Sequence, residues 1–129
     1  MTDRGSVHLT LVALLFGGTL MLGLAVDIAR FGGSWREASH LAATAAEAGA
    51  GWIDIEAAYD GRIVIDPVKA SDAARAVASS PGRRVRLEIT DERICVSVSI
   101  RVRPTLLTLA GAGDKRATAR SCAEPRRVP

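Results

Sequence analysis

The sequence predicts an α+β protein in which a long N-terminal helix carries a small head with a short helix and an antiparallel sheet. Three observations predict it: an apolar run without charges near the N-terminus, a helical pattern that continues after it, and an alternating pattern in the last third. The 129 residues suffice for one domain of ordinary size. We divide the chain into a leader-like segment 1–6, an apolar helix 7–26, a helical extension 27–59, a head 60–123 and a frayed tail 124–129.

Composition narrows the classes of function. Hydrophobic residues make up 48% of the chain, which excludes disorder of the whole, but aromatic residues make up only 4%. A core of Ala, Val, Leu and Ile suits helices packed through small side chains better than a deep cofactor pocket. With two His and two Cys, the chain has little material for catalysis or for a metal site. We therefore expect a protein that is not an enzyme and that binds neither a cofactor nor a metal.

The apolar helix 7–26 is expected to cross a membrane. Asp, Glu, Lys and Arg are absent between Gly5 and Asp27, and a helix of this length spans about 30 Å, the hydrocarbon thickness of a bilayer. The run is apolar on every face, unlike a helix that lies on a surface. A cleaved secretory signal is the alternative, but the charged start is short and no A-x-A site follows. We therefore predict a retained single-pass anchor, in which Ala13 and Gly17 permit close contact with another helix.

The helical extension 27–59 begins with charges and continues with a helical period. Asp27 and Arg30 are expected at the bilayer surface, and Gly32-Gly33 is a candidate kink or interruption. After the glycines, apolar positions recur at steps of three and four, which places them on one stripe of a second helical stretch from about Ser34 to Tyr59. The packing positions expected on this stripe are Leu41, Ala45, Ala48 and Trp52, followed by Ile55 and Tyr59.

The first part of the head is expected to contain a short strand and a helix. Asp60-Gly61 is a turn signal, and the β-branched run 62–66 predicts a strand. A helix follows from Lys69 to Ser80, where a Ser-Pro-Gly sequence ends it. The apolar side expected for this helix consists of Val68, Ala73, Ala76 and Val77.

The last third is expected to form an antiparallel sheet. Residues 85–89 and 94–102 alternate between apolar and polar side chains, which predicts two strands joined at Asp91-Glu92 with one face in water. A proline then ends the second strand. Residues 106–110 are expected to form a short apolar turn of helix, and residues 115–122 to return as a last strand.

The two cysteines bear on the orientation in the membrane. Cys95 lies on the polar side of its predicted strand, and the returning last strand would bring Cys122 alongside. A disulfide would close a loop of 27 positions and stabilise the fold by about 3–4 kcal/mol, whereas two unrelated thiols are the alternative. Because disulfides need an oxidising compartment, a bridge places the head outside the cytoplasm and the N-terminus inside. The basic residues, with Arg4 before the apolar helix and Arg30 and Arg36 after it, slightly favour the opposite orientation, and the cysteines help to decide between the two orientations.

Basic charge is concentrated in the last third of the chain. Residues 81–129 contain eleven of the seventeen Lys and Arg but no aromatic residue. A solvated strand face is the simpler interpretation, and a contact for nucleic acid or another anionic polymer is the alternative, without rings for base stacking. No G-x-x-x-x-G-K-[ST], G-x-S-x-G or H-E-x-x-H motif occurs, and His8 and His40 lie 32 positions apart. We find no set of residues that predicts an active site.

Five segments together carry a family resemblance. The opening Asp3 to Val7 leads directly into the apolar helix, Gly23 to Arg30 contains a D-x-x-R element, and Ala42 to Ala50 is rich in alanine. The alternating run 96–102 and the closing run Arg116 to Arg120 match in pattern. In these features the chain resembles the TadE/TadG-like proteins of the Tad (Flp) pilus-assembly system. Its size and its Ala and Arg content are most similar to the short TadE-like proteins found beside secretion ATPase genes in high-GC Gram-positive bacteria.

The resemblance implies a pilin-like or pseudopilin-like subunit. Its membrane helix would hold it in the bilayer and contact other pilus subunits, and its small α+β head would be exported. In processed relatives a prepilin peptidase cuts after the glycine that precedes the apolar run, which here is the bond between Gly5 and Ser6. Thr10 stands where processed relatives carry Glu, a residue that the TadG-like branch often lacks. The function expected is structural assembly in a Tad-type pilus or related secretion apparatus, with a DNA-binding or polyanion-binding head as the alternative.

Overall fold

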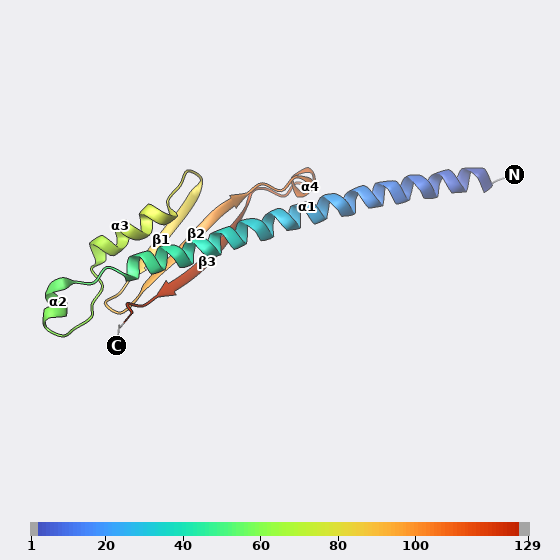
Figure 1. The fold of residues 1–129 in the computed structure, drawn as a ribbon. Coiled ribbons are helices and arrows are strands. Elements are labelled where there is room, and N and C mark those ends of the chain that lie inside the picture. Colours follow the sequence, from blue (N-terminus) through green and yellow to red (C-terminus); the bar gives the residue numbers. More distant parts are fainter. Residues whose placement is uncertain (1–2, 127–129) are drawn as a thin grey trace.

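The computed structural model describes residues 3–126, with side chains from residue 6 onward. As predicted, the fold is α+β: one long helix carries a small head that lies along its C-terminal half (Figure 1). The elements are α1 (Asp3–Ala50), α2 (Ile55–Tyr59), α3 (Pro67–Ala78), β1 (Arg83–Ile89), β2 (Ile94–Val102), α4 (Leu106–Leu109) and β3 (Lys115–Ala123).

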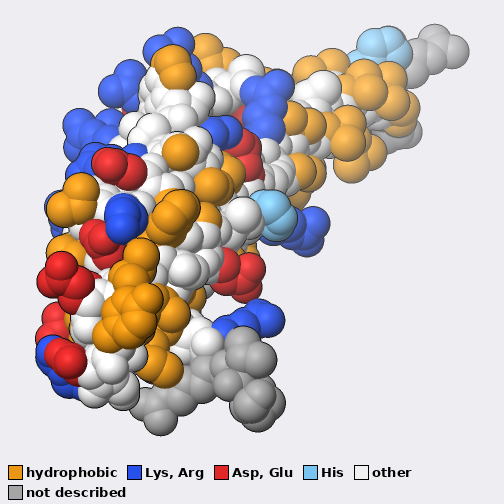
Figure 2. Space-filling model, turned by 60° about the vertical axis from the view of Figure 1, so that its left-hand side comes forward, with side chains coloured by type: hydrophobic (Ala, Val, Ile, Leu, Met, Phe, Trp, Pro, Cys, Tyr) orange, Lys and Arg blue, Asp and Glu red, His pale blue; other side chains and the backbone are white. Residues whose placement is uncertain are grey.

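Helix α1 runs without interruption through both the apolar segment and the head. Its 48 residues correspond to a length of about 72 Å. Gly32 and Gly33, the candidate kink or interruption, lie inside this continuous helix. An 18-residue window of α1 has a mean hydropathy of 2.3 and none of it is buried, so this helix is long and apolar enough to cross a membrane. Figure 1 shows its N-terminal part projecting from the head, and Figure 2 shows the hydrophobic side chains on that part.

The helical extension predicted through Tyr59 is wrong in its last part, because α1 ends at Ala50. Gly49 and Gly51 flank this end, and glycine is the weakest helix former after proline. The chain then leaves the helix direction, and the Asp54 carboxylate starts the separate helix α2. It accepts the backbone N–H groups two and three residues later, at 2.9 and 3.3 Å.

The buried side of α1 consists of small side chains. These are Ala38, Ala42, Ala45, Ala46 and Ala50. Of the predicted packing positions, Ala45 is buried, Leu41 packs at the edge of the core and Ala48 is half-buried. Three predicted positions lie beyond the end of the helix and are exposed, namely Trp52, Ile55 and Tyr59. The buried stripe therefore differs from the predicted one mainly in its alanines, which face the sheet and α3.

Helix α3 packs on α1 through alanines as well. Its buried residues are Ala70, Ala74 and Ala78. The predicted apolar side is therefore wrong in phase: Val68 is 69% exposed, and only Val77 packs against the core. A Cβ at Gly49 would lie 2.5 Å from the end of the Ile94 side chain and 3.1 Å from the Ala70 carbonyl oxygen, so α1 approaches both β2 and α3 closely at this glycine.

The N-terminus of α3 is capped by Asp66, whose carboxylate accepts the backbone N–H groups of Val68 and Lys69, both at 3.1 Å. The hydrogen bond from Lys69 N–H, assisted by the nearby ammonium of that residue, lowers the pKa of Asp66 below its ordinary value. The strand predicted just before this cap is absent from the described structure, where residues 62–66 contribute a single bridge between Ile65 and Ile53.

The sheet has the order β1-β2-β3 and is antiparallel throughout, as predicted for the last third. Its inner face packs on α1 and α3 with the fully buried side chains Ile94, Val96 and Val98 at the centre. The alternate residues of the strands form an outer face that carries most of the polar side chains. The hairpin between β1 and β2 closes where it was predicted, with Thr90 N–H donating to the Arg93 carbonyl at 2.9 Å.

Candidate functional site

The apolar helix and the head meet at Asp27, the first charged residue after the apolar segment. Asp27 is 3% exposed, and its carboxylate accepts three backbone N–H groups from the loop between β2 and β3. The donors are Thr105 at 2.8 Å, Leu106 at 2.9 Å and Leu107 at 3.1 Å. Hydrogen bonds to an ionised acceptor are stronger than those between neutral groups. Asp27 therefore caps α4 from a helix about 80 residues away in the sequence.

Two further residues of α1 face the same loop, one turn on each side of Asp27. The Arg30 guanidinium donates to the Thr105 hydroxyl at 2.5 Å. On the other side, a Cβ at Gly23 would overlap the Leu106 side chain, which lies directly on this glycine. Gly23, Asp27 and Arg30 are spaced by four and three residues and thus form one stripe of α1. We call the contact of this stripe with residues 103–113 the helix–loop junction.

The loop needs a cap from outside because it has none of its own. Thr105 stands at the N-cap position of α4, but its side chain makes no capping hydrogen bond there. The buried Pro104 ends the pairing of β2, and Gly111, with a φ of +86°, turns the chain back toward β3. The sequence placed Asp27 at the membrane surface and predicted the short helix, yet it contained no signal that the two meet.

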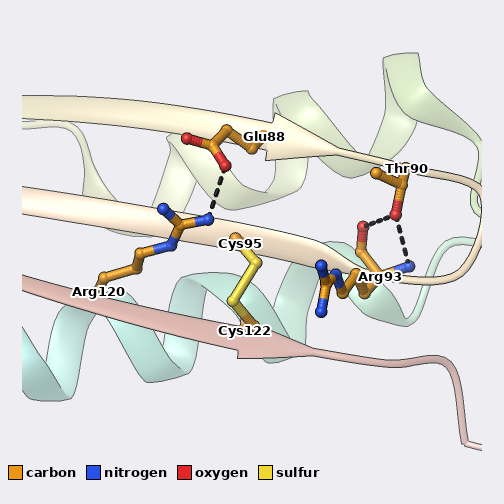
Figure 3. The surroundings of a disulfide bond; sticks show 6 residues. All are labelled: Glu88, Thr90, Arg93, Cys95, Arg120 and Cys122. Carbon is orange, nitrogen blue, oxygen red and sulfur yellow. Dashed lines mark hydrogen bonds and ion pairs between the residues drawn. A yellow bond between two sulfur atoms is a disulfide. The ribbon is translucent and has the colours of Figure 1, made fainter.

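The disulfide between Cys95 and Cys122 joins β2 to β3 on the outer face of the sheet (Figure 3). The two residues are directly opposed in the strand register, with Cα atoms 4.0 Å apart. Beside them, Arg120 donates to Glu88 at 2.6 Å and so links β3 to β1 across β2. Cys95 lies on the polar face as predicted, and it is nevertheless 95% buried because the bridge and its neighbours cover it. The alternative of two unrelated thiols is excluded.

The outer face of the sheet is strongly basic. Its arginines are Arg84, Arg86, Arg101, Arg116 and Arg120, and its small polar residues include Ser97, Ser99 and Thr118. Glu88 pairs with one of these arginines and Asp114 with another, and within the described part of the chain the remaining three have no carboxylate partner. These three, Arg84, Arg86 and Arg116, line a shallow groove around the hydrogen-bonded hydroxyls of Ser99 and Thr118.

The residues predicted to act in the membrane lie on the projecting part of α1. Gly5 and Ser6, which flank the candidate processing bond, belong to its first turns. Ala13 is exposed, and apart from α1 itself no described part of the chain lies within 4 Å of the position of a Cβ at Gly17. Close contact of these two residues with another helix stays a prediction.

The described residues offer no candidate metal site. Across residues 3–126, no three His, Cys, Asp or Glu side chains come together in a way that could hold a metal ion. His8 and His40 are exposed on α1, far from each other. Comparison with known proteins gives no match to a family model, to a curated protein or to a solved structure.

Proposed function

We propose that this chain is a structural, non-enzymatic subunit of the TadE/TadG-like kind, a pilin-like or pseudopilin-like component of a Tad-type pilus or a related secretion apparatus. The observation that supports this function is the continuity of α1: the same helix is fully exposed and apolar at its N-terminal end and supplies the core of the head at its C-terminal end. A subunit built in this way transmits the position of its membrane helix to its head without a flexible linker.

The chemistry of the projecting helix supports insertion in lipid. Large exposed side chains follow one another along it, for example Leu11, Leu15 and Leu22, and their burial in a bilayer or against other helices is strongly favourable. Its two threonines satisfy their own hydroxyls, because Thr10 donates to the Ser6 carbonyl at 2.9 Å and Thr19 donates to the Leu15 carbonyl at 2.8 Å. No partner is then needed for these groups inside the hydrocarbon.

The disulfide supports the proposed orientation in the cell membrane. A bridge such as Cys95–Cys122 persists in oxidising compartments, so the head would lie outside the cytoplasm and the N-terminus inside. The prepilin peptidase is a candidate partner at the bond between Gly5 and Ser6. Intact mass and N-terminal sequencing of the native protein test this step: a chain that begins at Ser6 supports processing, an intact one supports a permanent anchor, and one that begins beyond Val26 contradicts the membrane anchor.

Membrane retention is expected to depend on the apolar segment. The protein should sediment with the envelope fraction and resist extraction with alkaline carbonate. Leu15→Arg places a charge near the middle of the segment at a cost of about 2.5–3.5 kcal/mol and should lower the retained fraction sharply. Trp35→Arg, at a half-exposed position of α1 beyond the segment, is the matched control and should be retained like the wild type. Full-length protein in a detergent-free extract with none in the envelope would contradict the proposal.

Assembly through the membrane helix is expected to involve the face that carries Ala13 and Gly17. Ala13→Cys should form cross-linked copies or adducts with other subunits when membranes are treated with an oxidant, since small residues allow helices to approach closely. Leu15→Cys is the control, because a step of two residues turns the side chain by about 200° to the opposite face. The native cysteines do not interfere, since they are bonded to each other. Equal cross-linking at both positions would exclude this packing face.

A second candidate function is binding of DNA or another anionic polymer, and the gathering of arginines on one sheet face favours it. The detergent-solubilised protein should then retain DNA at low salt and release it as salt rises. Replacing Arg84, Arg86 and Arg116 together by Ala should weaken binding and reduce the slope of log K against log salt by about 2.7, whereas Arg62→Ala with Arg75→Ala, at exposed positions away from the sheet, should not. Absence of salt-sensitive retention would rule this function out.

A further inference from the structure

The turn α4 exposes leucines beside the apolar part of α1. Its sequence is Leu-Leu-Thr-Leu, and the Leu107 and Leu109 side chains are 39% and 82% exposed. Leu106 instead turns inward and lies on Gly23 of α1. The exposed side of α4 is therefore an apolar surface that adjoins the apolar surface of the projecting helix.

The position of this contact along α1 defines its level relative to a bilayer. Gly23 lies three residues before Val26, the end of the apolar segment, which is about 4.5 Å along the helix axis. Because the segment 7–26 matches the hydrocarbon thickness, this glycine lies just inside the hydrocarbon boundary when α1 is inserted. Leu106 occupies the same level, and the rest of α4 lies beside it.

The backbone N–H groups at the start and the end of the turn are paired within the chain. The N–H groups at its start donate to Asp27, as described above. The N–H groups that follow α4 donate to carbonyl groups within the turn. Ala110 N–H donates to the Leu106 carbonyl at 3.2 Å, Gly111 N–H to the Thr108 carbonyl at 3.0 Å and Ala112 N–H to the Leu107 carbonyl at 2.8 Å. The Thr108 hydroxyl in turn donates to the carbonyl of Pro104. Non-helical backbone is expensive in lipid because of unpaired polar groups, and this turn avoids most of that cost.

Basic side chains lie at both ends of the loop that contains the turn, and on α1 beside the start of the turn. They are Arg30, Arg101, Arg103 and Lys115. Asp114 is the carboxylate next to them, at 3.6 Å from Arg101 and 3.9 Å from Arg103. Long basic side chains at the end of an apolar surface extend toward lipid phosphates. An apolar turn with such residues at the ends of its loop is typical of a segment at the membrane interface.

We infer that α4 is a membrane-interface contact: Leu107 and Leu109 enter the boundary of the same bilayer that α1 crosses. The head then touches the lipid at a second point besides α1, and the junction at Asp27 holds this point at a constant height. This inference rests on the proposed membrane insertion of α1 and adds the bilayer itself as a partner of the head. It gives the head a defined tilt and rotation relative to the membrane.

Lipid quenching of a fluorophore tests this contact in the full-length protein. Leu109→Cys is labelled with an environment-sensitive dye, and the protein is reconstituted into phospholipid vesicles that contain a lipid with a nitroxide quencher near the headgroup. Tyr59→Cys, which is 89% exposed on α2 at the other end of the head, is the matched control. The label should attach only to the new thiol, because Cys95 and Cys122 are bonded. We expect at least about a twofold loss of fluorescence at position 109 and none at position 59.

Flotation of the same vesicles on a density gradient distinguishes a failure of the α4 contact from a failure of the membrane insertion of α1. If the protein floats with the lipid and the dye at position 109 is quenched no more than the dye at position 59, the interface contact is excluded and the membrane anchor stands. If the protein does not float, the proposed insertion of α1 fails and the interface contact fails with it. Leu107→Ser replaces a partly exposed apolar side chain of the same turn with a polar one. Loss of the quenching at position 109 in this variant would further support contact through the turn.

Discussion

Replacement of Asp27 by alanine is expected to release the loop that contains α4 from α1. The carboxylate accepts three backbone N–H groups for which the described part of the chain shows no other acceptor, so its removal leaves all three without this acceptor at a partly buried position. Hydrogen exchange of residues 105–107 should become at least about 100-fold faster, measured by mass spectrometry in detergent or vesicles. Exchange in the centre of β2 should change far less, because the sheet packs on α1 through other residues.

Two variants make this result specific. Asp27→Asn keeps the size of the side chain and one acceptor oxygen, but it replaces the other oxygen with an N–H₂ group that cannot accept. At least one of the three hydrogen bonds is then lost, so exchange should lie between that of the wild type and that of the alanine variant. Asp72→Ala removes an exposed carboxylate of α3 for which the structure shows no contact, and it should leave exchange unchanged. Wild-type exchange rates at residues 105–107 in Asp27→Ala would show that the carboxylate does not hold the loop. In the labelled protein, Asp27→Ala should also reduce the lipid quenching at position 109.

Among the substitutions described, removal of the disulfide is expected to lower the thermal unfolding temperature most. The bond between Cys95 and Cys122 spans 27 positions, and the chain-entropy estimate gives about 3–4 kcal/mol for a loop of this length. For a head of this size, the variant with both cysteines replaced by serine should unfold at least about 12 °C below the oxidised wild type. Circular dichroism of the detergent-solubilised protein measures the midpoint.

Reduction of the wild type is the control for this variant. The reduced protein and the double serine variant should have the same Tm, because both lack only the bridge. A double variant that unfolds at the Tm of the oxidised wild type would show that the bridge contributes no stability. Alkylation of the native protein without reductant should label neither cysteine, and labelling of both would remove the support for an extracytoplasmic head.

The cap and the disulfide act on the two ends of the same sheet. Near the membrane, Asp27 and Arg30 hold the chain that connects β2 to β3. Near the far end, Cys95 and Cys122 join the two strands directly. Between them, the alanines of α1 bury the inner face of the sheet. These contacts join the projecting helix to both ends of the head.

Local patterns were sufficient to predict the class of the fold and most of its elements. The uncharged run 7–26 predicts an apolar helix because lipid or protein must cover every face of such a helix. The alternation over 94–102 predicts a strand because one face of the strand is exposed to solvent. The opposition of Cys95 and Cys122 followed from the same alternation and from a returning strand. Each of these features depends on residues that are neighbours in the sequence or in one hairpin, so the pattern contains the information.

The tertiary structure alone decided which alanines are buried, where α1 ends and what Asp27 does. Alanine is tolerated on either side of a helix, so hydrophobic periodicity could not choose between Ala48, which was predicted, and Ala46, which is buried. Gly49 proved to be a point of close approach to α3 and β2, which only their packing reveals. Asp27 finds its partners some 80 residues away, and a contact over that distance depends on the return path of β2 and β3 rather than on any local preference.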